Sequence, residues 1–164
     1  MLTIISNAEQ LPYSQVMRVY EQSIQERAQK DHRNCCSMQQ LLNAEQDLYA
    51  YLQDVLEQKL AVLGFWTDNN RFVSALRLEK YRDGLLLTAL ETAPRERGKG
   101  YASMLVSCVV DQFSDSKIYS HIADNNLASI SVHLKCGFQK ISSSAVFLDG
   151  SQSTDASTYL YEKN

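Results

Sequence analysis

The sequence predicts a mixed α/β (α+β) fold built on a mainly antiparallel sheet. Residues 60–92 contain three β-prone segments separated by turn residues, which is the pattern of an antiparallel meander. Segments with the apolar spacing of α-helices lie before and after this meander. Residues 117–148 form a strand–helix–strand pattern, which adds a crossover to the sheet. We therefore expect six to seven strands and about four helices in a single domain, residues 1–164.

The first part of the chain predicts one short strand and two helices. Residues 2–6 are apolar and β-prone. Apolar residues recur at helical spacing over 13–24, and Pro12 before them suits a first helical position. The polar stretch 30–36 predicts a loop. A second helix is expected over 37–57, because its apolar residues fall on one face and a serine and a glutamine fit a capping box at its start.

The middle of the chain predicts three neighbouring antiparallel strands. The first covers residues 60–67 and leads into the turn residues 68–70, Asp-Asn-Asn. The second covers 71–81 and alternates between two faces. The third covers 85–92 and follows a turn at 82–84. Because turns this short join adjacent antiparallel strands, we expect all three to lie side by side.

The last part of the chain alternates between predicted helices and strands. Apolar spacing predicts a helix over 102–113, and residues 117–123 predict a strand. A second helix is expected over 126–136, followed by a strand over 138–148. A final strand is expected near 158–161.

The composition favours a folded, soluble protein. Hydrophobic residues make up 45% of the 164 residues and charged residues 21%, which is enough for a packed core. No apolar run reaches the roughly 20 residues that span a bilayer, and the N-terminus lacks the features of a signal peptide. We therefore expect a cytoplasmic protein that does not contact membranes. The net charge of −3 argues against a nucleic acid partner.

The cysteines predict neither a metal site nor a disulfide framework. Cys35, Cys36, Cys108 and Cys136 lack the Cys and His spacing of a zinc site, so no metal is expected. Reduced thiols are the expectation for a cytoplasmic chain. Cys136, beside a glycine at a helix end, is interpreted as a packing residue.

Residues 92–102 join a predicted strand to a predicted helix and carry the strongest functional signal. Gly98 and Gly100 lack Cβ atoms, so backbone N–H groups there can approach a ligand closely. The start of the following helix adds unpaired N–H donors and a partial positive charge. Three basic side chains are countered by one acid, and these four residues are Arg95, Arg97, Lys99 and Glu96. The loop predicts a phosphate or pyrophosphate site, and the alternative is a glycine-bearing turn with solvated basic side chains.

Two other nucleotide-binding motifs fail at this loop. Where a P-loop requires its first glycine the sequence has Ala93, and where it requires a hydroxyl the sequence has Gly100. A Rossmann turn requires a third glycine where the sequence has Ser103. The acidic ribose partner expected about 20 residues further on is replaced by Ser120 and His121. A dinucleotide-binding protein is therefore disfavoured.

Two motifs resemble those of the GNAT superfamily of N-acetyltransferases. Residues 95–100, Arg-Glu-Arg-Gly-Lys-Gly, resemble its coenzyme A signature Q/R-x-x-G-x-G/A. Residues 126–138 are similar to its second pattern, N-x-x-S-x-x-x-Y-x-K-x-G-F. The notable departure is His133, where the family usually carries tyrosine. The motifs occur in the family's order and spacing, and the resemblance extends from about residue 60 to 138.

This resemblance implies the GNAT fold, with two helices between the first strand and the meander, and acetyl-CoA as co-substrate. Backbone amides from Arg97 to Ala102 would hold the pyrophosphate. Backbone groups of Leu90 to Thr92 would hold the pantetheine arm and polarise the thioester carbonyl. The implied cofactor-binding residues are Leu90, Thr92, Arg95, Arg97, Gly98, Lys99, Gly100, Tyr101, Ala102, Asn126 and Ser129.

The resemblance gives His133 the position of the general acid that protonates the departing thiolate. A histidine with an ordinary pKa near 6.5 can donate a proton from its charged form or a hydrogen bond from its neutral ring, and it can also act as a base. On the predicted helix we expect Leu127, Ile130 and Leu134 to form the core face, with His133 at its rim on the line of Asn126. The alternative is a structural or surface histidine.

Glu91 is the second candidate catalytic residue, and it is suggested by the sequence alone. It ends an apolar strand beside the cofactor loop, where a carboxylate needs a partner. The partner could be an incoming ammonium group, whose proton Glu91 would accept, or a salt bridge to Arg77, Arg95 or Arg97. Arg77 and Glu79 could line the acceptor pocket, although solvated strand residues are an equal alternative.

The sequence thus predicts an acetyl-CoA-dependent N-acetyltransferase that acts on a primary amine of a small molecule or a peptide. The alternatives are an acyltransferase that uses a longer acyl-CoA and a coenzyme A-binding sensor without turnover. A homodimer is possible, and the sequence does not identify the acceptor.

Overall fold

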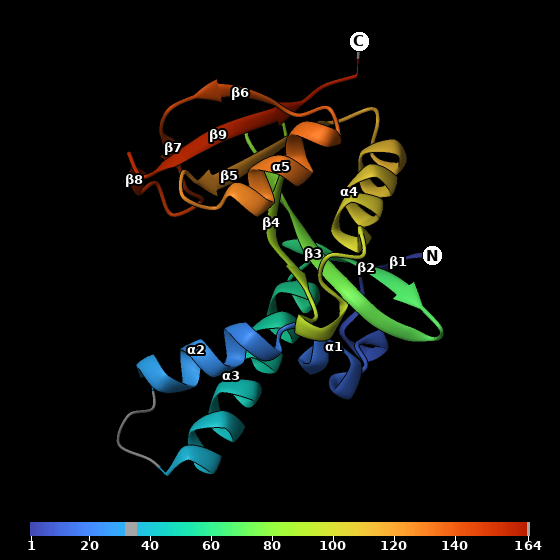
Figure 1. Cartoon of the computed structure of the whole chain (residues 1–164), viewed down its shortest axis with the longest axis vertical. Coiled ribbons are helices and arrows are strands. Elements are labelled where there is room, and N and C mark those ends of the chain that lie inside the picture. The colour runs from blue at the N-terminus through green and yellow to red at the C-terminus, as the bar shows by residue number, and fades with distance from the viewer. Residues whose placement is uncertain (32–35, 164) are drawn as a thin grey trace.

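The computed structural model describes residues 1–31 and 36–163, and its strands form one large sheet and a small hairpin (Figure 1). The first elements are β1 (Leu2–Ile5), η1 (Ala8–Gln10), α1 (Tyr13–Val19), α2 (Glu21–Asp31), α3 (Ser37–Glu57), β2 (Ala61–Asp68), β3 (Arg71–Tyr81) and β4 (Gly84–Thr92). The others are η2 (Pro94–Glu96), α4 (Tyr101–Gln112), β5 (Lys117–Ala123), α5 (Leu127–Lys135), β6 (Gln139–Ser142), β7 (Ala145–Val146), β8 (Gln152–Ser153) and β9 (Ala156–Tyr161).

The seven-stranded sheet has the order β1-β2-β3-β4-β5-β9-β6. Its neighbouring strands are antiparallel except for β4 and β5, which are parallel. The predicted mixed, mainly antiparallel sheet and the central meander are therefore confirmed.

The parallel pair β4–β5 is short, and the two strands separate beyond it. Pairing runs from Gly84 opposite Lys117 to Leu87 opposite Ser120, and the remainder of β4 pairs only with β3. At the separation β4 has one extra residue against β3, and Ala89 there adopts a φ of 50°. A β-bulge of this kind bends a strand, and a non-glycine residue at positive φ is a local strain found often at functional sites. Figure 1 shows the resulting gap between β4 and the β5–β9–β6 half of the sheet.

Helices cover both faces of the sheet. α1 and α3 contact β3 and β2 on one face, and their core includes Val16, Leu52 and Phe65. α4 contacts β1 to β4 on the opposite face, where Leu76 and Leu105 lie in a second core. Burial on two faces explains why β3 buries even polar residues on both of them, such as Ser74 and Glu79.

The first predicted helix, over residues 13–24, is divided into two in the structure. α1 ends at Val19, Tyr20 adopts a non-helical conformation, and α2 then runs on to Asp31. Tyr20 and Ile24 continue the buried line of α1, so the apolar spacing did not reveal the break. The described residues therefore contain five α-helices rather than about four.

The predicted strand over 138–148 is also interrupted. β6 ends in a run of serines, where the Ser142 hydroxyl accepts a hydrogen bond from the Ser144 amide at 3.1 Å. Serine side chains that bond to nearby backbone compete with a strand ladder in this way. The chain then forms the small β7–β8 hairpin, and β8 was not predicted.

The remaining differences are local. The third helix does span 37–57, but Cys36 is its N-cap and no side chain caps it, so the predicted capping box is wrong. Most of the predicted loop 30–36, with Cys35, lies outside the described residues, and its first two residues belong to α2. No helix in the described part of the chain is both long and apolar enough to cross a bilayer.

A substitution at Gly84 tests the importance of the short β4–β5 pairing. A Cβ at this position would lie 2.2 Å from the Lys117 carbonyl oxygen, a backbone atom that cannot rotate away. We expect Gly84→Ala to lower the free energy of unfolding by about 2–3 kcal/mol through overpacking. Urea denaturation followed by circular dichroism measures the change.

Gly150→Ala is the matched control for this experiment. Gly150 has a φ of +81° but open space around its Cβ position, so only the backbone strain of about 1–2 kcal/mol is expected. A Gly84→Ala variant that unfolds at the same urea concentration as the wild type would show that the close approach at Gly84 does not matter.

Candidate functional site

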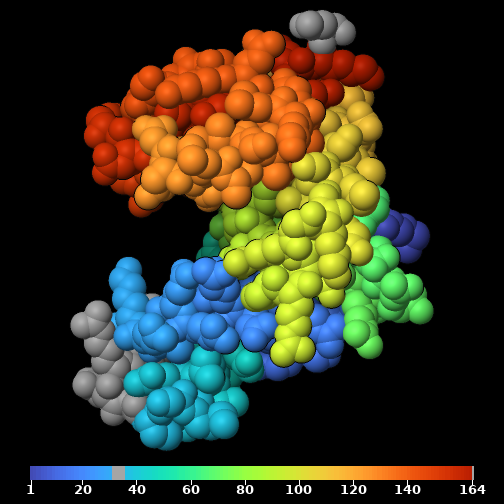
Figure 2. Space-filling model, in the orientation of Figure 1, coloured from blue at the N-terminus to red at the C-terminus, as the bar shows by residue number. Residues whose placement is uncertain are grey.

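A cleft of about 630 Å³ lies where β4 separates from β5. Figure 2 shows the hollow between α2 on one side and α5 on the other, with the loop after β4, in yellow, at its right-hand end. The residues that line it are Gln22, Ser23, Glu26, Leu90, Glu91, Thr92, Glu96, Arg97, Gly98, Gly100, Tyr101, Ala102, Ser103, Asn126, Ala128, Ser129, Val132 and Lys135.

The unpaired edge of β4 supplies backbone groups to this cleft. The Glu91 carbonyl accepts from the Ser74 hydroxyl at 2.7 Å and the Ala93 N–H donates to the Val73 carbonyl at 2.9 Å, so both point towards β3. Because backbone groups alternate along a strand, those of Thr92 point the other way, towards the cleft. The loop thus begins with main-chain donors and acceptors that β5 does not pair.

The glycine loop after β4 leads directly into α4. Gly98 and Gly100 have φ values of +77° and +83°, and Gly100 is the N-cap of the helix. No atom lies within 4 Å of a Cβ built on either glycine, so the loop backbone is open to a ligand. The first N–H groups of α4, from Tyr101 to Ser103, have no partner inside the helix and face an anion favourably.

The basic residues of the loop have different positions. Arg97 lines the cleft, where its Nε donates to the Thr92 carbonyl at 3.1 Å and its Nη1 donates to Gln22. Lys99 pairs with Glu96 at 2.6 Å, which raises the pKa of the lysine, and it does not line the cleft. Arg95 is exposed and also lies outside the cleft lining.

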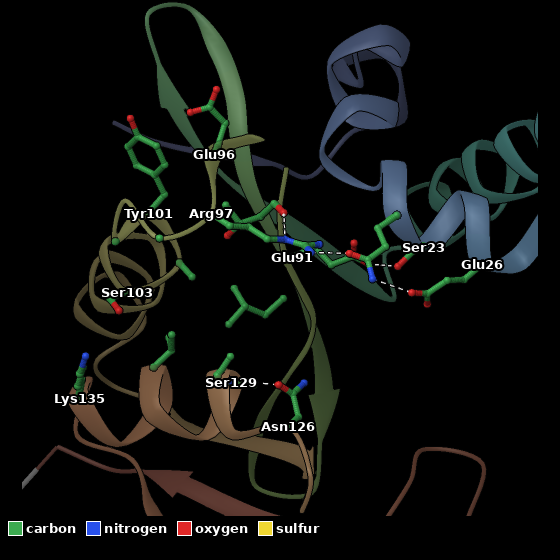
Figure 3. A pocket seen from close by; sticks show the side chains of 18 residues that line it. Ser23, Glu26, Glu91, Glu96, Arg97, Tyr101, Ser103, Asn126, Ser129 and Lys135 are labelled. Atoms are coloured by element: carbon green, nitrogen blue, oxygen red, sulfur yellow. Dashed lines mark hydrogen bonds between the residues drawn. The ribbon is translucent and has the colours of Figure 1, made fainter. Parts of the chain in front are cut away.

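α5 forms the opposite wall along one face, from its N-cap to its last residue. Asn126 is the N-cap, and its side-chain oxygen accepts from the Ser129 N–H at 3.1 Å, as Figure 3 shows. Ser129 lines the cleft one turn further on, and Lys135 lines it at the end of the helix. Lys135 occupies the lysine position of the second motif but was not predicted as a site residue.

His133 is buried rather than at the rim of the cleft. Its exposed fraction is 1%, it is absent from the cleft lining, and its ring meets Phe138 edge to face. Nδ1 lies 2.8 Å from the Ser129 carbonyl oxygen and 3.4 Å from the Ser129 hydroxyl, so Nδ1 carries the proton in the neutral ring. Nε2 is buried and has no hydrogen-bond partner among the described residues.

The expected core face of α5 is partly wrong. Ile130 packs against the core as expected, but Leu127 and Leu134 are 73% and 52% exposed, and His133 is buried. The leucines are apolar, but both sit on the solvent side of a helix at the edge of the fold. Burial lowers the pKa of the His133 imidazole, outweighing its bond to the Ser129 carbonyl, so the ring is neutral near pH 7.

Glu91 lines the cleft and faces α2. It accepts a hydrogen bond from the Ser23 hydroxyl, and Figure 3 shows the pair beside Glu26. Burial raises the pKa of Glu91, the Ser23 bond and the charge of Arg97 lower it, and the charge of Glu26 raises it further. No ion pair within 4.0 Å joins Glu91 to an arginine in the described part of the chain.

The polar residues behind Glu91 form a separate group. Arg77 pairs with Glu79, and its guanidinium lies over the Tyr51 ring. Neither Arg77 nor Glu79 lines the cleft. Tyr20 is 3% exposed, and its hydroxyl has no partner among the residues described. Burial raises the pKa of Tyr20, and the charge of Glu91 raises it further, so Tyr20 is a protonated neighbour of that carboxylate.

The structure therefore brings together most of the predicted site residues. Those that line the cleft are Leu90, Glu91, Thr92, Arg97, Gly98, Gly100, Tyr101, Ala102, Asn126 and Ser129. His133, Arg95 and Lys99 do not line it. The residues of α2 were missed, because neither Ser23, on the predicted helix over 13–24, nor Glu26, just beyond it, belongs to a motif. The described residues include no group of His, Cys, Asp and Glu side chains arranged for a metal ion.

A model of the acetyltransferase (GNAT) family matches residues 22–138 of this chain. The chain belongs to the GNAT acetyltransferase family. The matched range runs from the α2 wall through β4 and the glycine loop to the end of the second motif. A comparison of the chain with curated proteins finds no match.

Solved GNAT structures share the fold at low sequence identity. The PaiA N-acetyltransferase from Thermoplasma acidophilum, in complex with coenzyme A, has a TM-score of 0.66 and 10% identity over 99% of both chains. Spermidine N-acetyltransferase SpeG from Vibrio cholerae has a TM-score of 0.57 and 17% identity over 71% of this chain and 73% of that chain. The ribosomal-protein-alanine N-acetyltransferase from Brucella melitensis has a TM-score of 0.57 and 14% identity over 73% and 78%.

The burial of His133 makes the stability of this GNAT protein sensitive to acid. The folded state keeps the imidazole neutral, whereas the unfolded chain takes up a proton near pH 6.5, so stability is lost as the pH falls below that value. The free energy of unfolding of the wild type should fall between pH 7 and pH 5. In His133→Phe we expect this fall to be about 1 kcal/mol smaller. Urea denaturation at the two pH values measures this difference.

A direct titration supports the same test without a variant. The imidazole of His133, followed by NMR in the folded protein, should titrate below pH 6.5. A midpoint above 6.5, or equal acid sensitivity of wild type and His133→Phe, would contradict the assignment.

Proposed function

We propose that the protein transfers an acetyl group from acetyl-CoA to a primary amine of a small molecule or a peptide. The observation that carries this proposal is the meeting of the unpaired β4 edge with the glycine loop and the first turn of α4. Family membership supports acyl transfer, and the PaiA structure in complex with coenzyme A supports this co-substrate.

The cleft offers a suitable surface for each part of acetyl-CoA. The open amides of the glycine loop and the first turn of α4 suit the pyrophosphate, with Arg97 and Lys135 as nearby cations. The backbone of Leu90 and Thr92 suits the amides of the pantetheine arm, which can pair with a free strand edge. The thioester would then lie between the end of β4 and the start of α5, near Asn126.

The proposed reaction is a direct attack on the thioester. The amine nitrogen forms a bond to the carbonyl carbon, and the carbon–sulfur bond of the tetrahedral intermediate then breaks. The nitrogen loses one proton and the departing thiolate takes up one, so the products are the N-acetyl amine and coenzyme A. An acceptor that arrives as an ammonium ion must first lose a proton, and Glu91, with its raised pKa, is suited to accept it directly or through water.

The catalytic role of His133 stays a prediction from the motif. Direct proton transfer to the thiolate requires the imidazole to reach the cleft, and in this structure Ser129 lies between them. The His133→Phe variant also answers this question. A loss of 10²-fold or more in kcat would support an acid–base role, and a rate within about threefold of wild type would rule it out.

The acceptor is proposed at the level of a primary amine. Two of the structural relatives are named for their acceptors, spermidine in one case and a ribosomal-protein alanine in the other, and both acceptors present an amine. The carboxylate of Glu91 beside the thioester position supports an acceptor of this kind. The cytoplasmic location and the homodimer stay predictions from the sequence.

Acetyl-CoA binding tests the cofactor assignment. Valine at position 100 would place a β-branched side chain at a φ of +83° and cover the amides of the loop. We expect Gly100→Val to weaken acetyl-CoA binding at least tenfold in isothermal calorimetry. Gly150→Val, at a similar φ in the β7–β8 turn, should bind as the wild type does.

The calorimetry also separates the alternatives. If the wild-type protein binds neither coenzyme A nor acetyl-CoA, the proposed function is wrong. Binding without thiol release for any amine would instead favour the sensor, and preferential binding of a longer acyl-CoA would favour a different acyl donor.

Substitution of Glu91 tests its role in the chemical step. Glu91→Gln keeps the hydrogen bond with Ser23 but cannot accept a proton, so we expect kcat/KM for an amine acceptor to fall about 10²-fold. In the wild type, kcat/KM should fall with decreasing pH at a midpoint above 4.5, because burial raises the pKa of Glu91. This acid limb should be absent in the variant.

Glu57→Gln, at the exposed end of α3, is the control for the loss of one negative charge. An unchanged kcat/KM and pH profile in Glu91→Gln would exclude Glu91 from the reaction.

A further inference from the structure

The α2 side of the cleft carries two carboxylates. Glu91 reaches it from β4 and contacts Ser23, and Glu26 follows Ser23 by one turn on the same side of α2. The two carboxylates repel each other, and the charge of Glu26 acts to raise the pKa of Glu91. No lysine or arginine among the described residues lies within 4.0 Å of either carboxylate.

Arg97, the nearest cation of the cleft, reaches from the glycine loop to Gln22 on α2, and its charge acts to lower the pKa of Glu91 although no ion pair within 4.0 Å joins the two. Its guanidinium donates to the Thr92 carbonyl and to Gln22, and the Gln22 amide in turn donates to Glu26 at 2.7 Å. A neutral glutamine therefore stands between the arginine and Glu26. Because acetyl-CoA brings several negative phosphate charges to the loop, the complex would make the acceptor end more negative still.

We propose that the acceptor is a primary amine with a second positive charge, namely an aliphatic diamine or a longer amine of that type. This inference rests on the proposed function. The reacting amine lies at Glu91, and the second ammonium group lies at Glu26. Glu91 is hydrogen-bonded to Ser23, one helical turn before Glu26, so the two carboxylates are separated by roughly the 5–6 Å between side chains one turn apart, which about three to five methylene groups span.

The same charges argue against other amines. A simple monoamine pairs with Glu91 alone and leaves Glu26 without a cation, in contact with Gln22 and water. A free amino acid carries a carboxylate next to its amine, and that group would meet two like charges. Charge complementarity of this kind selects among ligands by difference in affinity.

A comparison of matched amines tests the inference. With acetyl-CoA as donor, thiol release gives kcat/KM for 1,4-diaminobutane and for butylamine. Two equivalent amino groups account for a twofold preference, and we expect the wild type to prefer the diamine about tenfold. Glu26→Gln should reduce this preference to about twofold, and added salt should reduce it in the wild type because Glu26 is exposed.

Glu21→Gln is the matched control, because Glu21 lies on α2 outside the cleft. It should keep the diamine preference. A wild-type preference of twofold or less, or a preference that survives in Glu26→Gln, would overturn the inference. Thiol release with butylamine would still support the proposed function in that case. Thiol release with neither amine nor with any other amine would overturn both.

Discussion

The site depends on the short length of one parallel strand pair. β4 and β5 share four paired positions, from Gly84 opposite Lys117 to Leu87 opposite Ser120, and then separate. The bulge at Ala89 turns β4 away, and a hydrogen-bonding edge is left open inside the protein. Elsewhere in a sheet such an edge is a liability, but here helices on both sides shield it from other chains and leave it to a ligand.

The two ends of the cleft differ in charge. The loop amides and the start of α4 favour anions at one end, whereas Glu91 and Glu26 lie at the α2 wall, to which Arg97 reaches through Gln22. A negative co-substrate and a cationic acceptor would therefore be drawn to opposite ends of the cleft. The thioester would lie between them, where positioning and a fixed amide environment can lower the barrier.

Much of the fold followed from local pattern, and the errors have identifiable causes. Turn residues fixed the meander, and glycine spacing placed the cofactor loop before α4. The break at Tyr20 was hidden because α1 and α2 bury the same line of residues. On α5 the apolar character of a side chain did not predict its burial, since Leu127 and Leu134 face solvent while His133 faces inward.

The part of the cleft formed by the glycine loop could be located from the sequence because a contiguous loop and a motif carry it. The α2 wall could not be located in this way, because Ser23 lies 68 positions before Glu91 in the sequence and meets it only through the tertiary fold. The helix periodicity showed which face of this segment is buried. It could not show which strand end the other face would approach.

The two walls of the cleft come from opposite parts of the chain, α2 near its beginning and α5 near its end. Neither wall can form a binding surface by itself, so recognition waits for long-range folding to finish. A molecule bound between the walls would stabilise the folded state, since it binds only when both walls are in place. Occupancy would then protect distant segments from transient opening and proteolysis together.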